Sequence, residues 1–556
     1  MVDRVILYAS LLASVIRPPN KTNLTLLCAT IPAHWFFSKS YVLGMRWQVI
    51  PSYCAIAVSI CGGNPLLSAV LGLLGFLADT AIPEITLDSG VIKGEHSVGY
   101  FDYEILNTKE LLINENTNVS TSKPAIGRIF YPTKVPHNIT SSYFFQNDRH
   151  GLTRRFVATS GIWNLIPQMP SWILSHWSKI QIPVSLGAEP LDKKMPVIVF
   201  SHGNTASREL STTMALSLAS SGEAVVVLVE HTDCSSSLAR FSNGDSIEFD
   251  HSVGKLGNDP ETIEFLNARR SQTRIRSQNI RDSIAFLWHI NQGTKGLSKY
   301  IVSMNDGSGG SCSSRISRSS NGNCTNNNSS SCLLSSFSGR LNLQEIGVGG
   351  HSFGGATALT YAAEAINGRI VGPASKCNIS GLFVMDPANS WIPDEVRLDV
   401  GLGVKPDVKY YWKKNMNASP SPPLLSQKIC TMFMYSEFWW SVDKWSQYGK
   451  EFIKSSSFSN SLYIVIQGCG HQSLCDMAIL LPNFLNVKLM KNTLPGYQSK
   501  DLLPVINTVL LKWLNKASVL KNDTQNHDMR HLNGTTGVII PDSGTNNRGN
   551  GIRSEL

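Results

Sequence analysis

Continuous apolar runs alternate with helical segments along most of the chain. The runs are rich in β-branched residues, as strands buried on both faces of a parallel sheet are. They lie at residues 195–200, 224–229, 379–385, 430–435 and 462–466. Helices are expected between such runs, at 209–220 and 261–291. This alternation predicts an α/β fold with a mostly parallel, doubly wound sheet flanked by helices.

Four other segments do not follow that pattern. Residues 99–105 and 126–132 alternate apolar and polar positions, which is typical of antiparallel strands. Residues 303–338 consist mainly of Ser, Asn and Gly, and we expect them to be a disordered insertion. The polar tail, residues 517–556, is expected to be disordered as well. The predicted α/β domain therefore covers residues 95–516.

Residues 1–94 form a hydrophobic region unlike the rest of the chain. Its first apolar run, 5–16, follows Arg4 and has the length of a secretory signal peptide, which is too short to span a bilayer. A later run, 53–82, is long enough to cross about 30 Å of hydrocarbon, which takes about 20 apolar residues. Asn64-Pro65 at its centre makes a broken or re-entrant helix equally compatible. We expect this region to associate with a membrane; the alternative is a cleaved signal followed by a hydrophobic segment packed on the α/β domain.

A G-x-S-x-G motif occurs where a strand pattern gives way to a helix pattern. The motif, Gly350-His351-Ser352-Phe353-Gly354, follows the apolar residues Ile346 and Val348 and precedes an alanine-rich segment. In such a nucleophile elbow, a tight turn lifts the serine oxygen above the sheet edge, and the glycines allow a close backbone approach. The helix N-terminus then faces developing negative charge. Ser352 is therefore the predicted nucleophile of an enzyme with the α/β-hydrolase fold.

A serine hydroxyl needs a histidine that accepts its proton and a carboxylate that orients the histidine. In α/β-hydrolases these residues follow in the order Ser, acid, His. Three histidines follow Ser352, and two of them, His527 and His531, lie in the polar tail. His471 lies in a turn directly after the strand 462–466, so we predict that it is the base.

The acid is less constrained by the chain order. Asp386 directly follows the strand 379–385 and begins a turn at Pro387, whereas Glu437 and Asp443 follow the next strand. We favour Asp386 on these grounds, and Glu437 and Asp443 remain the alternatives. A turn-forming or helix-capping role is the other interpretation of Asp386.

Ester hydrolysis also needs hydrogen-bond donors aimed at the oxyanion of the tetrahedral intermediate. The backbone N–H of Phe353, directly after the nucleophile, is the first predicted donor. The backbone N–H of Asn204 is our candidate for the second, because it follows Ser201-His202-Gly203 at the end of an early strand. Glu230 and His231, at the end of the next strand, are expected to support the site rather than to form a catalytic pair.

Composition adds three expectations to this picture. Charged residues make up only 16% of the chain and hydrophobic residues 42%, which indicates a sizeable core and further apolar segments. The net charge is +9, and five arginines gather in the predicted helix 261–291, namely Arg269, Arg270, Arg274, Arg276 and Arg281. We interpret them as a solvated helix face, because no nucleic-acid motif accompanies them.

The eleven cysteines contain no metal-type C-x-x-C pair, so mostly packed thiols are expected. A lumenal compartment would permit a disulfide between Cys469 and Cys475. No metal ion or cofactor is expected.

Several blocks of the sequence, in similar order and spacing, resemble the platelet-activating factor acetylhydrolases of the plasma and type II intracellular kind. Between residues 95 and 515 these blocks are Ser97-Val98-Gly99, Phe130-Tyr131-Pro132, 196–203, 218–222, 229–233, 350–357 and His471-Gln472. The resemblance implies a calcium-independent serine lipase that removes a short or oxidised acyl group from the sn-2 position of a glycerophospholipid. It places the nucleophile on Ser352, the acid on Asp386 and the base on His471. It places the oxyanion donors on Asn204 and Phe353.

The chain also departs from the pattern of this family. The family has an aromatic residue shortly after the acid, where this chain has Pro387-Ala388-Asn389 and only then Trp391. Cys234 stands where the family often has arginine, and Asn204 replaces an apolar residue. These departures concern the preferred acyl chain and not the reaction class.

The expected partner is a phospholipid at a membrane or lipoprotein-like interface, and not nucleic acid. The expected location is a membrane, the secretory pathway or the exterior rather than the cytoplasm. Two alternatives remain. One is an esterase of the same fold with another substrate, and the other is a catalytically silent lipid-binding protein.

Overall fold

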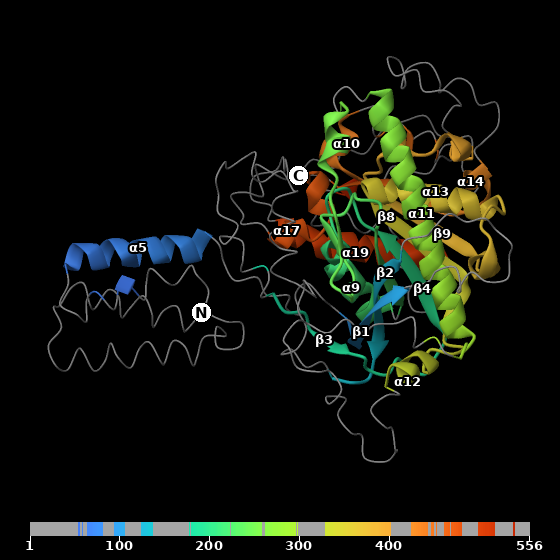
Figure 1. Ribbon diagram of the computed structural model, residues 1–556. Helices are drawn as coiled ribbons and strands as arrows, with labels where there is room; N and C mark the ends of the chain where they lie inside the picture. Colours follow the sequence, from blue (N-terminus) through green and yellow to red (C-terminus); the bar gives the residue numbers. More distant parts are fainter. Residues whose placement is uncertain are drawn as a thin grey trace, which may run out of the picture.

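A computed structural model of the chain describes residues 64–81, 94–105, 124–136, 180–222, 224–257, 262–295, 329–397, 399–401, 424–442, 461–466, 469–480 and 499–517, together with a few shorter pieces. Its centre is a ten-stranded sheet in the order β12-β11-β10-β9-β8-β4-β5-β2-β1-β3 (Figure 1). The strands are β1 (Ser97–Ile105), β2 (Ala125–Thr133), β3 (Val184–Leu186), β4 (Met195–Ser201), β5 (Val225–Glu230), β8 (Leu341–His351), β9 (Ile379–Met385), β10 (Cys430–Ser436), β11 (Leu462–Ile466) and β12 (Val538–Ile539). A separate hairpin consists of β6 (Leu238–Arg240) and β7 (Ser246–Glu248).

The sheet is parallel in its middle and antiparallel towards both sides. All neighbouring strands from β5 through β4, β8, β9 and β10 to β11 pair in parallel. By contrast, β2 pairs antiparallel with both β1 and β5, and β12 pairs antiparallel with β11. The predicted fold class, a mostly parallel sheet with early antiparallel strands, is confirmed.

The strand order reverses at β4. The chain moves outward from β4 to β5 and later returns to the other side of β4 as β8. Ligands of open α/β sheets bind at such a point, outside the carboxyl ends of the strands. The predicted turn at Gly203 and the predicted elbow at Ser352 both follow strands that meet here.

Helices cover both faces of the sheet and bury its side chains (Figure 1). On one face α9 (Thr212–Gly222) and α19 (Ser499–Lys516) pack against the sheet, and on the other α11 (Ile263–Asn291) and α13 (Phe353–Ile366) do so. Shorter helices are α10 (His251–Lys255), α12 (Ser329–Ser335), α14 (Leu424–Lys428), α15 (Glu437–Trp440) and α17 (Met477–Leu480). Within the described residues there are also five 3-10 helices: η3 (Arg208–Ser211), η6 (Gly372–Lys376), η7 (Asn389–Trp391), η8 (Asp394–Val396) and η9 (His471–Leu474).

The long helix α11 corrects one prediction. Its N-terminus is capped by the hydroxyl of Thr262, which accepts a hydrogen bond from the N–H of Phe265 at 3.2 Å. We expected its arginines to form a solvated face, but Arg269, Arg270, Arg276 and Arg281 are at most 9% exposed. Only Arg274, paired with Glu395, lies partly in solvent. The prediction is wrong because α11 is covered both by the sheet and by the segment around η7 and η8, which supplies partners for the guanidinium groups.

The structure describes only part of the predicted insertion and of the predicted polar tail. The C-terminal part of the predicted insertion 303–338 belongs to the folded domain. Residues 329–335 form α12, and Leu334 and Phe337 are buried in the core. In the predicted tail, Val538–Ile539 adds β12 to the sheet edge. The rest of the insertion and of the tail lies outside the described residues.

Of the hydrophobic N-terminal region, the structure describes mainly α5 (Pro65–Ala81). Pro65 begins this helix rather than breaking it, and the side chain of Asn64 accepts a hydrogen bond from the N–H of Leu66 at 2.8 Å. No helix within the described residues combines the length and the apolar character needed to cross a membrane. The apolar run 5–16 lies outside the described residues.

Cys469 and Cys475 are both buried and carry separate thiols. The Sγ atoms donate instead to neighbouring oxygens, that of Cys469 to the carbonyl of Ile466 and that of Cys475 to the carbonyl of Gln472. The disulfide that the spacing would permit is therefore not formed.

Candidate active site

Ser352 sits on a sharp turn between β8 and α13. Its φ of 57° and ψ of −117° are outside the helical and extended regions, and its N–H donates to the carbonyl of Met385 at 2.8 Å. A Cβ on Gly350 would overlap the carbonyl of Gly354, and a Cβ on Gly354 would overlap the carbonyl of Ser201. Both glycines are therefore required by the close approach of backbone segments at the elbow.

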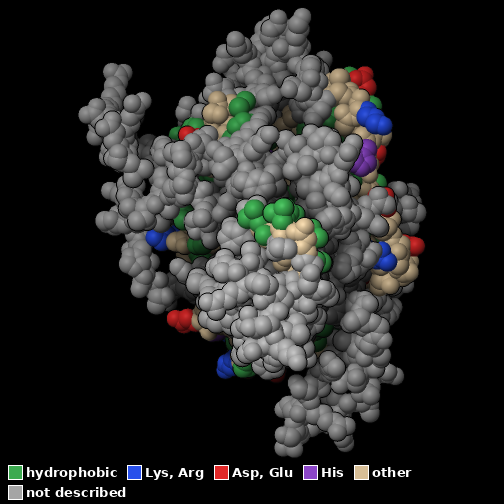
Figure 2. Space-filling model, turned by 90° about the vertical axis from the view of Figure 1, so that its left-hand side faces the viewer, with side chains coloured by type: hydrophobic (Ala, Val, Ile, Leu, Met, Phe, Trp, Pro, Cys, Tyr) green, Lys and Arg blue, Asp and Glu red, His purple; other side chains and the backbone are tan. Residues whose placement is uncertain are grey.

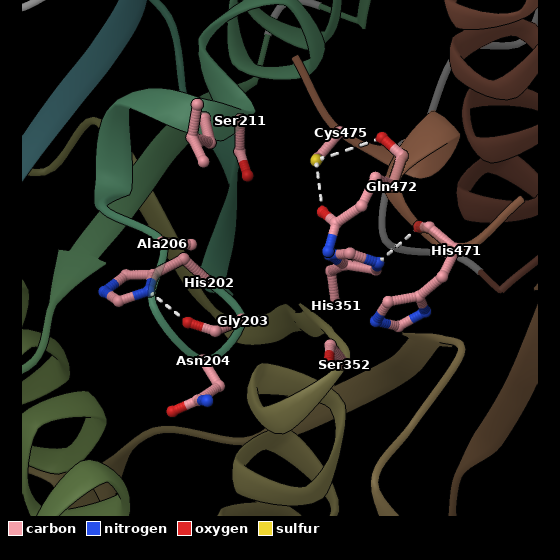
Figure 3. A pocket seen from close by; sticks show the side chains of 11 residues that line it. His202, Gly203, Asn204, Ala206, Ser211, His351, Ser352, His471, Gln472 and Cys475 are labelled. Carbon is pink, nitrogen blue, oxygen red and sulfur yellow. Dashed lines mark hydrogen bonds between the residues drawn. The ribbon is translucent and has the colours of Figure 1, made fainter. Parts of the chain in front are cut away.

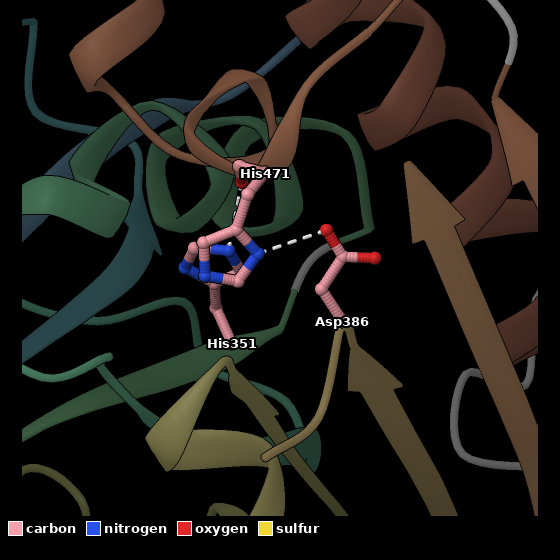
Figure 4. A group of neighbouring side chains, drawn as sticks. All are labelled: His351, Asp386 and His471. Carbon is pink, nitrogen blue, oxygen red and sulfur yellow. Dashed lines mark hydrogen bonds and ion pairs between the residues drawn. The ribbon is translucent and has the colours of Figure 1, made fainter. Parts of the chain in front are cut away.

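His471 and Asp386 come together at the carboxyl ends of neighbouring strands. His471 follows β11 and begins η9, and its Nδ1 donates to Asp386 Oδ2 at 2.9 Å (Figure 4). Asp386, fully buried after β9, also accepts hydrogen bonds from the N–H and the hydroxyl of Ser436 at 2.8 and 2.6 Å. Because Nδ1 carries the proton, Nε2 of the neutral ring keeps its lone pair.

Burial sets the charge states of these groups. It lowers the pKa of His471 to about 3, so the imidazole is neutral at neutral pH. It raises the pKa of Asp386 to about 7, although the hydrogen bonds from Ser436 act in the opposite direction. A neutral histidine is the form that can take a proton from a serine hydroxyl.

Ser352 and His471 line the same cleft. Within the described part of the chain, no hydrogen bond joins Ser352 Oγ to His471. The contact through which the serine proton would be transferred is therefore not formed in this structure. Contacts of this kind are often long until a substrate is bound. The walls of the cleft are formed by His202, Gly203, Asn204, Ala206, Leu210, Ser211, His351, Ser352, His471, Gln472 and Cys475 (Figure 3).

Two aromatic rings that the sequence reasoning missed pack against His471. Trp439 stacks on it with ring centroids 4.2 Å apart and an interplanar angle of 17°. The ring of His351 lies 4.6 Å away, and its Nε2 donates to the carbonyl of His471 at 3.0 Å. Burial lowers the pKa of His351 to about 3, so this neighbour is neutral as well. In the sequence, the position of His351 inside the G-x-S-x-G motif was the only indication that this residue belongs to the site. No such indication existed for Trp439.

His351, Asp386 and His471 also form the kind of cluster that can hold a metal ion. Their ligand atoms lie within 4.8 Å of one another (Figure 4). In this structure, however, the ring nitrogens are used in hydrogen bonds: Nδ1 of His471 to Asp386 and Nε2 of His351 to a backbone carbonyl.

The opposite wall of the cleft comes from the turn after β4. Gly203 lies against the nucleophile, because a Cβ on it would be 3.2 Å from Cβ of Ser352. His202 holds this turn: its Nδ1 donates to the carbonyl of Gly203 at 2.8 Å, and its Nε2 donates to Glu230 Oε1 at 2.8 Å. Asn204, the next residue, lines the cleft. On the other side of Ser352, Phe353 begins α13, where the first N–H groups have no partner within the helix.

Three of the predicted site residues line the cleft, namely Asn204, Ser352 and His471. The other two adjoin them: Asp386 is hydrogen-bonded to His471, and Phe353 directly follows Ser352. Asp386, rather than the alternative Glu437, is the carboxylate hydrogen-bonded to His471. Glu437 is partly exposed at the start of α15, and Asp443 lies outside the described residues. Glu230 and His231 are buried beneath the turn, where His231 Nε2 lies 2.7 Å from the hydroxyl of Ser201.

Residues 85–306 match the family described as platelet-activating factor acetylhydrolase, isoform II. A curated relative, platelet-activating factor acetylhydrolase of Cavia porcellus, is 24% identical over 255 residues, which are 44% of this chain and 48% of the relative. The chain thus matches about half the length of that relative. A ferulic acid esterase from Streptomyces cinnamoneus is similar in structure, with a TM-score of 0.49, 13% identity, and coverage of 81% of this chain and 98% of that one.

The family match ends before the elbow, so the roles of Ser352, Asp386 and His471 rest on the geometry described above. The match shows that the part of the chain that includes β1 to β5 and α11 is similar to this family. The expected resemblance to the platelet-activating factor acetylhydrolases is confirmed over residues 85–306, on a chain with the α/β-hydrolase fold.

Proposed function

We propose that the protein hydrolyses the short acetyl or oxidised acyl ester at the sn-2 position of glycerophospholipids such as platelet-activating factor, without calcium. The family match and the curated relative support the coarser assignment, an ester hydrolase acting on lipids. One observation carries the proposal: a buried Asp386–His471 pair shares a cleft with a serine on a nucleophile elbow.

In the proposed reaction, Ser352 Oγ attacks the ester carbonyl while Nε2 of His471 takes its proton. Asp386 stabilises the imidazolium that forms, through the hydrogen bond from Nδ1. The N–H groups of Asn204 and Phe353 donate to the carbonyl oxygen as it becomes negatively charged. The C–O bond to glycerol then breaks, and the leaving alkoxide takes the proton back from His471. Water, activated by the same histidine, releases the acid from the acyl-enzyme.

A substrate panel tests this proposal. Phosphatidylcholines that differ only in sn-2 acyl length are offered to the wild type and to Ser352→Ala, with and without a calcium chelator. We expect the acetyl substrate to be hydrolysed fastest, with no effect of the chelator, and no hydrolysis or fluorophosphonate labelling by Ser352→Ala. Preference for a simple carboxylic ester over every phospholipid would indicate another esterase of this fold. Labelling that persists in Ser352→Ala would refute the assignment of the nucleophile.

We also propose that the N-terminal region binds the lipid surface that carries the substrate. The support is α5, whose aliphatic side chains are exposed, Leu66 by 70% and Leu73 by 58%. Figure 2 views the molecule from the side on which α5 lies and has hydrophobic side chains at the surface. Sedimentation with phosphatidylcholine vesicles tests this. The double variant Leu66→Gln/Leu73→Gln should bind less than the wild type, and Leu256→Gln, an exposed leucine elsewhere, should not; equal binding by all three would contradict the proposal.

A further inference from the structure

The two proposed oxyanion donors, the N–H groups of Asn204 and Phe353, lie on different segments. Side chains on one buried face of α11 contact both segments. Arg269 and Arg276 are seven residues apart, so they lie on the same side of the helix. Both are buried, with 3% and 0% exposure. Neither carries a role in the proposed reaction, and a buried guanidinium is retained only where its donors are used.

Both arginines hold the turn after β4. Nη1 of Arg269 donates to Asn204 Oδ1 at 3.0 Å and to Gln272 Oε1 at 2.8 Å. Nη2 of Arg276 donates to the backbone carbonyl of His202. The side chain of Asn204 is thus held from outside the turn, and its backbone N–H is the proposed oxyanion donor.

The same guanidinium groups pack on the residue that follows the nucleophile. The Arg276 guanidinium lies 4.3 Å from the ring centroid of Phe353, and that of Arg269 lies 5.8 Å from it. Arg269 also lies 4.8 Å from the ring of Trp391 and 5.1 Å from that of Phe265. Rigid aromatic planes on several sides leave the guanidinium of Arg269 little freedom to move.

We propose that Arg269 is a positioning residue, which sets the separation of the two oxyanion donors by binding the Asn204 side chain while packing against the Phe353 ring. The inference rests on the proposed ester hydrolysis but not on the choice of phospholipid. Donors must lie about 2.7 to 3.1 Å from the oxyanion, so a small shift of the Asn204 turn weakens transition-state stabilisation. This also gives a reason for the asparagine at a position where the resemblance predicts an apolar residue: an apolar side chain would leave Arg269 without this acceptor.

The experiment compares Arg269→Met, Asn204→Leu and the double variant with the wild type. Methionine keeps an unbranched chain over the aromatic rings and removes the donor, and leucine removes only the acceptor, so Asn204→Leu remains informative if Arg269→Met does not fold. The control is Arg274→Met on the exposed side of the same helix. Hydrolysis of p-nitrophenyl acetate gives kcat and KM, and inhibition by a trifluoromethyl ketone reports affinity for a tetrahedral oxyanion.

We expect each single variant to lose about tenfold in kcat with KM unchanged, which is less than the loss of a whole donor. The affinity for the trifluoromethyl ketone should fall by the same factor, and the double variant should be no worse than either single one. Arg274→Met should behave as wild type. Unchanged kcat and ketone affinity in Asn204→Leu, or additive losses in the double variant, would overturn the proposal. If the wild type neither hydrolyses the ester nor reacts with a fluorophosphonate, the proposed function itself fails instead.

Discussion

Two histidine–carboxylate pairs lie beside the cleft, and they have similar hydrogen bonds but different surroundings. His471 and Asp386 lie at the ends of β11 and β9, and His202 and Glu230 lie at the ends of β4 and β5. The hydrogen bonds are nearly equal, 2.9 Å in the first pair and 2.8 Å in the second. The His471 side chain is 17% exposed, whereas that of His202 is 1% exposed.

The surroundings of the carboxylates explain the difference. Burial alone would raise the pKa of Glu230, but His202, which donates a hydrogen bond to it, and secondly the nearby guanidinium of Arg208 hold this pKa at about 2. Asp386 accepts from the uncharged groups of Ser436, and burial raises its pKa to about 7. His202 donates from both ring nitrogens, whereas His471 has one nitrogen left for the cleft. A histidine–carboxylate pair therefore becomes a site for proton transfer only where one ring nitrogen stays open and no fixed cation holds the pair.

The largest difference between the pairs should appear when the rings are removed. His471→Ala is expected to lower kcat by about 10⁶-fold, because it removes the imidazole that is proposed to take the proton of Ser352. His202→Gln should lower kcat far less, because that ring has no open nitrogen. Ester hydrolysis by both variants is the measurement, and equal losses would contradict the distinction.

Asp386→Asn should lower kcat by about 10⁴-fold, because an amide no longer stabilises the Nδ1–H form of His471 or its imidazolium. The matched control is Glu437→Gln, which changes the carboxylate that does not contact His471. Steady-state kinetics with a short-acyl ester distinguishes them. A larger loss in Glu437→Gln would reverse the assignment of the acid.

Glu230→Gln should act on stability. Removing one partner of a buried ion pair leaves an unpaired charge, and we expect the free energy of unfolding to fall by about 3–5 kcal/mol. Glu395→Gln, which breaks the partly exposed pair with Arg274, should cost at most about 1 kcal/mol. Urea unfolding at neutral pH measures both values.

The pH dependence adds a check of sign. The folded pKa of Glu230, about 2, is below the ordinary value of 4.5, so its contribution is present above pH 4.5 and is lost as the pH falls through about 2. The stability difference between wild type and Glu230→Gln should therefore shrink over that window. A difference that grows on acidification would contradict the lowered pKa.

The smallest expected effect concerns Trp439, whose ring stacks on that of His471. Because burial lowers the pKa of His471 to about 3, kcat/KM of the wild type should not fall near the ordinary histidine value of 6.5. Trp439→Ala admits water and should move the acid limb towards 6.5, which corresponds to a loss of at most about tenfold one pH unit below that value. Trp440→Ala, whose ring packs on Tyr463 at 5.0 Å, is the control and should keep the wild-type profile.

The sequence predicted the strands well because a parallel sheet covered on both faces requires continuous apolar runs. Chain order was enough to select His471 as the predicted base, because the competing histidines lie in the polar tail. It could not decide between Asp386 and Glu437, since both follow strands that are neighbours in the sheet. That choice depends on the backbone at Asp386, whose φ of 43° is part of the turn that carries its carboxylate.

The buried arginines could not be placed from the sequence. Their partners are far away along the chain: 65 residues separate Arg269 from Asn204, and 124 separate Arg270 from Asp394. A charged residue is ordinarily exposed unless it is paired, and pairing is a property of the fold. For the same reason Trp439 gave no signal, because its contact with His471 joins the ends of two strands.

The left-handed backbone at Ser352, Asp386 and Thr205 limits how the protein can be engineered. Side chains other than glycine are strained in this conformation, so substitution by glycine at these places would relax the native state. At Ser352 and Asp386 the same substitution deletes the group on which the proposed reaction depends. Substitutions meant to raise thermal stability should therefore avoid the ends of β8 and β9, because a change that stabilises the fold there would also lower the rate of the proposed reaction.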